Sequence, residues 1–237
     1  MSALYQELDY QQTPLGPLML RRRRVGEQDI FEVKLGDDFL MSSQFTRGEE
    51  ELAALALARI DGDQLDVLVG GLGLGYTACA ALTDARIANL VIVEKFAPVV
   101  DWCAAGLIPN GVTFGSDGRT QIVIRDFFEW AAQDLNDSEL CGIDRFHAVL
   151  LDIDHSPVSL LDARNETFYS APALRRFAER LHPGGVFALW SNEAPAEDFM
   201  ATLRDVFDQA EAAIVDFPSP ATGRVESNTI YLASKRR

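Results

Sequence analysis

The sequence predicts an α/β fold in which a doubly wound, mostly parallel seven-stranded sheet follows an N-terminal β-hairpin extension. Three observations predict it. Short apolar segments alternate with helical ones from residue 61 onward, the first of them runs into a glycine-rich turn, and the stretch before them alternates β-like segments with turn formers. Strands that are apolar nearly throughout are typical of a parallel sheet with helices on both faces.

The N-terminal part, residues 1–60, is expected to form a β-hairpin or small meander followed by a linking helix. Turn formers at Gly26 and at Gly36-Asp37-Asp38 separate the β-like segments. The helix begins with acidic residues, as the helix dipole favours. The expected elements are strands at 18–22, 31–35 and 39–41 and a helix at 49–60.

Residues 61–237 are expected to form the second and larger part, with one ligand-binding sheet. Each apolar strand is followed by a helical segment, except near the end of the chain, where two strands come in succession. The expected strands are 67–69, 90–93, 121–124, 148–151, 185–190, 213–217 and 229–233, and the expected helices are 77–82, 98–105, 127–135, 173–181 and 196–210.

The composition limits the partners. The chain has 237 residues and a formal charge of −15, and such a surface repels nucleic-acid phosphates and anionic lipids. No nucleic acid and no membrane is expected as a partner. The charge would attract amines, although solubility explains it equally well. The basic run Arg21–Arg24 is interpreted as a solvated strand face or a subunit contact.

The cysteines predict reduced thiols rather than disulfides or a zinc site. Cys79, Cys103 and Cys141 are scattered and form no CxxC pair. No apolar run approaches the roughly 20 residues of a membrane span, and the N-terminus carries no basic-then-apolar signal. The protein is therefore expected in the cytoplasm.

The strongest motif is the glycine turn that follows strand 67–69. Gly71, Gly73 and Gly75 surround Leu72 and Leu74 in a G-x-G-x-G spacing. Residues without side chains let the chain turn tightly and let a ligand contact backbone N–H groups at a helix N-terminus. Dinucleotide folds favour G-x-G-x-x-G, so the shorter spacing favours a nucleoside without a pyrophosphate.

Three successive strands each end in an acidic residue. Glu94 comes about 20 residues after the turn, where a carboxylate can accept hydrogen bonds from ribose hydroxyls. Asp126 closes the next strand, and Phe127 beside it is positioned to stack on a purine. Asp152 closes the expected strand 148–151 and points at the crevice where open α/β sheets bind ligands. Together with the glycine turn, these acids predict a nucleoside-type cofactor.

These residues resemble the spermidine synthase family, the aminopropyltransferases, within the Rossmann-like class I fold of the S-adenosylmethionine-dependent methyltransferases. The resemblance spans most of the chain. It covers the β-rich N-terminus, the glycine turn, Val91-Ile92-Val93-Glu94, and Asp126 with an aromatic neighbour. Further along it covers Leu151-Asp152, Phe168-Tyr169 and Leu181-His182-Pro183-Gly184-Gly185-Val186.

The resemblance implies roles for single residues. Glu94 is similar to the family's ribose-binding acid and Asp126 to its adenine-binding acid. Asp152 resembles the acid that starts the gating loop and helps to deprotonate the attacking amine, and Tyr169 is implied to line the acceptor pocket. A primary amine with a pKa near 10.4 needs roughly 4.6 kcal/mol to lose its proton at pH 7, which a nearby carboxylate reduces. The family also implies a homodimer.

The departures from the family decide between donors. The aminopropyltransferases usually carry an aspartate where this chain has Leu74, and it holds the amine of decarboxylated S-adenosylmethionine. Leu74 therefore favours S-adenosylmethionine itself and methyl transfer to a small amine or similar nucleophile. Aminopropyl transfer is the alternative, and a non-catalytic nucleoside-binding protein is the third. The Tyr-His pair of the first helix is also missing, since Thr46–Leu52 reads Thr-Arg-Gly-Glu-Glu-Glu-Leu.

The gating loop adds two candidates beside Asp152. It runs Asp152-Ile153-Asp154-His155-Ser156-Pro157, so His155 is a candidate general base and Asp154 a weaker candidate for the catalytic site. Loop residues bonded only to the backbone are the alternative for both. No second cluster completes a metal shell around these residues, so no metal is expected.

Overall fold

The computed structural model describes residues 5–133, 140–219 and 223–235. Its centre is a seven-stranded sheet with the order β10-β11-β9-β8-β5-β6-β7. The five strands from β9 to β7 run parallel, whereas β11 pairs antiparallel with both β9 and β10. The predicted fold class, a mostly parallel seven-stranded sheet, is confirmed.

Each of the seven predicted strands lies within an observed strand, and the observed strands extend them by up to five residues at either end. The central strand β5 is buried at five of its six residues, which explains its near-continuous apolar sequence. The strands are β5 (Leu65–Gly70), β6 (Ile87–Glu94), β7 (Thr120–Ile124), β8 (Phe146–Leu151), β9 (Leu181–Ser191), β10 (Gln209–Ser219) and β11 (Arg224–Ser234).

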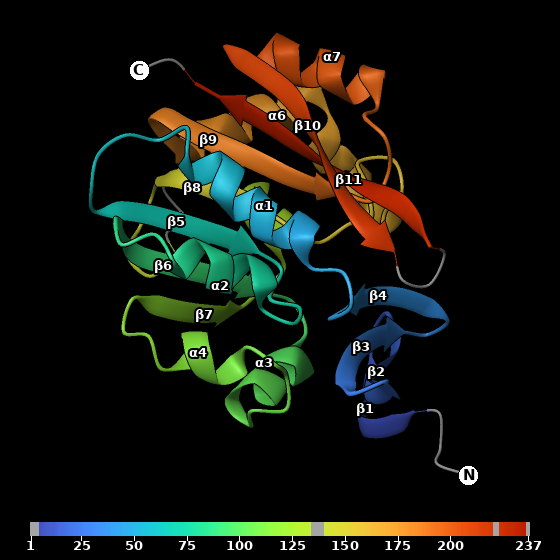
Figure 1. Ribbon diagram of the computed structural model, residues 1–237. Coiled ribbons are helices and arrows are strands. Elements are labelled where there is room, and N and C mark those ends of the chain that lie inside the picture. Colours follow the sequence, from blue (N-terminus) through green and yellow to red (C-terminus); the bar gives the residue numbers. More distant parts are fainter. Residues whose placement is uncertain (1–4, 134–139, 220–222, 236–237) are drawn as a thin grey trace.

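Helices cover both faces and enclose two apolar cores. One core holds side chains of α1, α2, α3 and α4, and the other holds those of α5, α6 and α7 with the two 3-10 segments. Figure 1 shows α1 and α2 lying side by side on the first face. The helices are α1 (Arg47–Leu57), α2 (Tyr76–Leu82), α3 (Ala97–Ala104), α4 (Gly111–Gly115), α5 (Phe127–Ala131), α6 (Ala171–Phe177) and α7 (Glu197–Val206), with 3-10 segments η2 (Ala163–Tyr169) and η3 (Ala178–Arg180).

The helix predictions and the structure differ in several places. The predicted helix 196–210 ends at Val206, and β10 already begins at Gln209. Helix α5 ends at Ala131, and residues 134 and 135 of that prediction lie outside the described ranges. The segments α4 and η2 were not predicted at all, since their five and seven residues are too short to show a helical period.

The N-terminal extension is a four-stranded antiparallel meander with the order β1-β2-β3-β4. Strand β1 was not predicted because none of its eight residues is fully buried, so it carries no alternating apolar pattern. The strands are β1 (Gln6–Thr13), β2 (Gly16–Val25), β3 (Gln28–Leu35) and β4 (Asp38–Ser42). In Figure 1 this meander, in blue, lies at the ends toward which the parallel strands point.

The arginine run Arg21–Arg24 lies on β2 and is paired within the meander. Arg21 Nε and Arg23 Nε both donate to the buried carboxylate of Glu32, at 2.7 and 2.5 Å. Arg24 pairs with Asp29 at 3.0 Å. The run therefore balances acids on β3, which fits the solvated-strand interpretation; the subunit contact stays a prediction.

Two side chains hold the meander against the large sheet. The indole Nε1 of Trp102 on α3 donates to Asp9 on β1 at 2.6 Å, and this bond is the main reason that the pKa of Asp9 lies below its ordinary value. Met41 on β4 packs against Gly73 of the glycine turn. The meander thus forms one wall of the space above the turn.

The cysteines agree with the prediction of reduced thiols. All three cysteines are free thiols; Cys103 is buried and Cys79 half-buried, but Cys141 is exposed. Among the described helices, none has both the length and the apolar character needed to cross a membrane.

The aromatic core beneath the sheet gives a test of the fold. Phe177 is 0% exposed and contacts the rings of Phe127, Phe168 and Phe187. Phe177→Ala leaves a cavity there and should lower the free energy of unfolding by about 3–5 kcal/mol in urea denaturation. Val158 is 68% exposed, so Val158→Ala should change it by less than about 0.5 kcal/mol. Equal effects of the two variants would contradict this packing.

Candidate active site

One pocket lies above the carboxyl ends of the parallel strands, closed on one side by the N-terminal meander. This is the place where open α/β sheets bind their ligands, and residues of both the meander and the large sheet line it. Nine of the eleven candidate residues from the sequence line it, namely Gly71, Gly73, Leu74, Gly75, Glu94, Asp126, Phe127, Asp152 and His155. The two that do not are Asp154 and Tyr169.

The three predicted glycines have left-handed backbones, with φ of 95° at Gly71, 53° at Gly73 and 84° at Gly75. Each also sits where a side chain would collide. A Cβ at Gly71 would fall 2.2 Å from the carbonyl oxygen of Asp152, and a Cβ at Gly75 would fall 2.2 Å from the ring of Phe114. The G-x-G-x-G spacing therefore follows from both backbone conformation and close packing.

Glu94 ends β6 and binds the glycine turn to the sheet. Its carboxylate accepts hydrogen bonds from the backbone N–H of Leu72 at 2.9 Å and of Phe96 at 2.7 Å. Burial raises the pKa of Glu94, and the surrounding backbone N–H groups partly offset that rise. The predicted ribose-binding acid thus lies in the pocket, and it also orders the turn.

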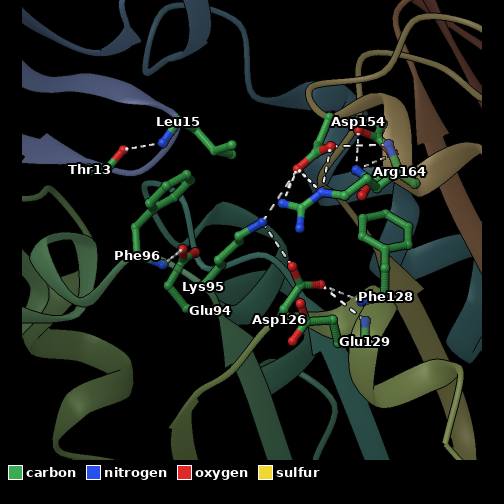
Figure 2. Close-up of polar contacts among 12 residues, drawn as sticks. Thr13, Leu15, Glu94, Lys95, Phe96, Asp126, Phe128, Glu129, Asp154 and Arg164 are labelled. Atoms are coloured by element: carbon green, nitrogen blue, oxygen red, sulfur yellow. Dashed lines mark hydrogen bonds and ion pairs between the residues drawn. The ribbon is translucent and has the colours of Figure 1, made fainter.

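Asp126 has two partners inside the protein (Figure 2). Its Oδ1 caps α5 by accepting from the backbone N–H of Phe128 at 2.8 Å and of Glu129 at 3.2 Å. Its Oδ2 pairs with Lys95 Nζ at 2.8 Å. Burial raises the pKa of Asp126, but the Lys95 ammonium and the helix N–H groups outweigh it, so the pKa is below its ordinary value. The acid therefore remains ionised at the pocket wall.

Two neighbouring rings, Phe127 and Phe128, line the pocket, whereas the sequence suggested purine stacking for Phe127 alone. Phe127 is 1% exposed and packs among Phe168 and Phe177 below the pocket. Phe128 is only partly buried and also lines the pocket. Stacking of a purine on Phe127 stays a prediction, and Phe128 is the more accessible of the two rings.

Asp152 faces a carboxylate that the sequence analysis missed. The hydroxyl of Thr77 on α2 donates to Asp152 Oδ2 at 2.7 Å. Burial raises the pKa of Asp152 to about 6. On α1, burial and the nearby charge of Asp152 raise the pKa of Glu49 to about 8. Two acids that meet in a low-dielectric pocket disfavour each other's ionisation, so the pair holds a proton near neutral pH.

The position of Glu49 could have been found from the helix period. The residues of α1 buried toward the sheet include Leu52, Ala53, Ala56 and Leu57. Glu49 precedes the first two by three and four residues, so it lies on the same helix face. From the sequence alone, Glu49 was related only to the dipole of the expected helix.

Asp154 and Tyr169 come together below the pocket rather than in it. Asp154 is 1% exposed and accepts from Tyr169 Oη at 2.7 Å, from Asn165 Nδ2 at 2.9 Å and from the Leu161 N–H at 2.8 Å. Burial raises the pKa of Asp154, and these hydrogen bonds partly offset the rise. This network fixes the gating loop. A direct catalytic role for Asp154 and an acceptor contact for Tyr169 do not match this placement, because each polar atom is used internally.

His155 and Trp190 complete the acid-bearing end of the pocket. His155 lines the pocket, and its backbone carbonyl accepts from the N–H of Asn192 at 2.8 Å. Trp190 also lines the pocket, and its buried indole Nε1 has no hydrogen-bond partner in the part of the chain that the structure describes. Leu74 is 3% exposed and belongs to the apolar core that α1, α2, α3 and α4 cover.

A separate group of metal-capable side chains lies at the other ends of the strands. Asp66, His147 and His182 bring one ligand atom each within 4.8 Å of one another. Two of these positions are already used, because His147 Nδ1 accepts the Asp66 N–H at 3.0 Å and Asp66 accepts from Asn89 at 2.7 Å. The group is remote from the pocket, and the predicted lack of a metal stays a prediction.

The fold is that of the Rossmann-like class that includes spermidine synthase. The chain is similar to a spermidine synthase solved with the transition-state analogue AdoDATO, with a TM-score of 0.72 and 18% identity over 97% of this chain and 74% of that one. A spermidine synthase from Thermotoga maritima gives a TM-score of 0.69 and 18% identity over 97% and 73%. No family model and no curated protein sequence matches the chain. The predicted resemblance is confirmed at the level of the fold.

The glycine turn gives a test of the site. Gly71→Ala combines an unfavourable left-handed backbone with a collision against the Asp152 carbonyl. It should lower the free energy of unfolding by at least about 1–2 kcal/mol and shift the pocket floor. Gly118→Ala meets nothing within 4 Å and should be close to neutral. Urea denaturation measures both, and a neutral Gly71→Ala would show that the turn is less tightly packed than described.

Proposed function

We propose that this protein transfers an alkyl group from a sulfonium nucleoside to an amine, with aminopropyl transfer from decarboxylated S-adenosylmethionine as the better supported reaction. The single observation that carries the proposal is the pocket, which joins the glycine turn, Glu94 and Asp126 to a pair of acids at its far end. Support also comes from the likeness to spermidine synthases, one of them solved with AdoDATO.

In this proposal Asp152 is the catalytic base. The amine nitrogen attacks the carbon bound to sulfur, the C–S bond breaks with its electron pair going to sulfur, and the amine proton passes to Asp152. The product is a neutral thioether and a secondary amine. Because burial raises the pKa of Asp152 to about 6, it is a stronger base than an ordinary aspartate and still mostly ionised at pH 7. The Thr77 hydroxyl orients it.

The preference for the decarboxylated donor replaces the expectation drawn from Leu74. Leu74 removes one acid from the turn, but Glu49 and Asp152 together place negative charge at the same end of the pocket. The α-carboxylate of S-adenosylmethionine would add a further acid beside these two in a poorly hydrated space. Methyl transfer from S-adenosylmethionine stays the second candidate, favoured only by the apolar Leu74. The homodimer stays a prediction.

The donor preference is tested by isothermal titration with both donors. We expect decarboxylated S-adenosylmethionine to bind at least about tenfold more tightly, a difference of about 1.4 kcal/mol. Tighter binding of S-adenosylmethionine would favour methyl transfer. Binding of neither would remove the nucleoside donor from the proposal.

The catalytic assignment is tested with Asp152→Asn. The amide keeps the shape of the side chain but cannot accept the amine proton, so kcat should fall by about 10²–10⁴-fold. Donor affinity should remain within a few-fold, since Asp152 acts on the acceptor. Asp144 is exposed, so Asp144→Asn serves as a control with unchanged turnover. Full activity of Asp152→Asn in a transfer assay with a diamine acceptor would refute the assignment.

A further inference from the structure

Glu49 enters the pocket because the residue before it has no side chain. A Cβ at Gly48 would lie 2.4 Å from Asn228 Oδ1 and 2.5 Å from Trp190 Nε1. Only glycine lets the first turn of α1 press this closely against β9 and β11. The close approach places Glu49 among the residues that line the pocket, which also include Asp152, His155 and Trp190.

Among the described residues, no base balances the acids Glu49 and Asp152. In the part of the chain that the structure describes, no lysine or arginine pairs with Glu49 or Asp152. Lys95 is the lysine of the pocket lining, and its ammonium pairs with Asp126 at 2.8 Å and lies 3.8 Å from Asp162. A cation that binds beside such acids favours their ionised form, and a cationic ligand would supply it.

We propose that Glu49 is the specificity-determining residue for the charge of the donor tail: its carboxylate accepts hydrogen bonds from a primary ammonium on that tail and excludes a tail with a carboxylate. This inference rests on the proposed function and adds to it the residue that selects the donor. The division leaves Asp152, held by Thr77, for the amine of the acceptor.

The charge balance supports this division. Decarboxylated S-adenosylmethionine carries two positive charges, on sulfur and on its terminal amine, and the acceptor amine carries a third until it loses its proton. One acid near the terminal amine of the donor and one near the acceptor amine face two of these three cations, and the transfer itself removes the third, the sulfonium charge. A hydrogen bond between charged groups is the strong kind, and an amide in place of the acid keeps only a weaker, uncharged acceptor.

The test compares three ligands with three proteins by isothermal titration. The ligands are decarboxylated S-adenosylmethionine, S-adenosylmethionine and neutral methylthioadenosine, which lacks the amine. The proteins are the wild type, Glu49→Gln and the matched control Glu50→Gln, which changes the exposed neighbour on the same helix turn. We expect Glu49→Gln to weaken the binding of the decarboxylated donor at least about tenfold and to leave the affinity for methylthioadenosine unchanged. The ratio of the affinities for the decarboxylated donor and for S-adenosylmethionine should therefore become smaller.

A second readout follows from the proton that the acid pair holds. Burial and the charge of Asp152 raise the pKa of Glu49 to about 8, so at pH 7 Glu49 is mostly protonated and must release its proton when the ammonium binds. Titrations in buffers of different ionisation enthalpy should show this proton release in the wild type and a smaller one in Glu49→Gln. The other titratable groups near Glu49 are Glu50, Tyr76 and His155.

The outcomes separate the two proposals. If the wild type binds none of the three ligands, the proposed function fails and the role of Glu49 fails with it. If the wild type prefers the decarboxylated donor and Glu49→Gln keeps that preference and proton release in full, the proposed function stands and the inference about Glu49 is overturned. Loss of methylthioadenosine binding in Glu49→Gln would also overturn it, since it would show a general structural defect.

Discussion

The site depends on the close packing of the glycine turn between three strand ends. Gly71 approaches the backbone of Asp152 so closely that no Cβ fits, and Glu94 accepts backbone N–H bonds from Leu72 on the same turn. These contacts fix the ends of β5, β6 and β8 relative to one another. The acids Glu94 and Asp152 are placed from that junction, whereas Glu49 is placed by the packing of α1 at Gly48.

The electrostatics of the pocket divide it into two ends. At one end Asp126 is neutralised by Lys95 and by the N-terminus of α5, so its charge is met within the protein. At the other end Glu49 and Asp152 are met by no cation among the described residues, and burial raises the pKa of both. A neutral nucleoside suits the first end and a cationic tail suits the second. Binding energy and charge selection are thus provided by different parts of the chain.

Two similar acids in the loop after β8 have different environments in the structure. Asp152 and Asp154 look alike in the sequence, both acidic and both just past a strand. In the structure Asp152 keeps its carboxylate in the pocket, whereas Asp154 turns inward and is consumed by Asn165, Tyr169 and the Leu161 N–H. The buried bonds of Asp154 hold the loop in shape, so its contribution to the site is to position its neighbours.

The sequence by itself determined the sheet, the glycine turn and the acids at the strand ends, because hydrophobic period, left-handed glycines and strand ends are local properties of the chain. It missed β1, whose residues are too exposed to show a period. Only the tertiary structure decided which acid faces which. Glu49 meets Asp152 across about a hundred residues of chain because Gly48 lets α1 approach β9, and no local pattern records a contact made by two distant elements.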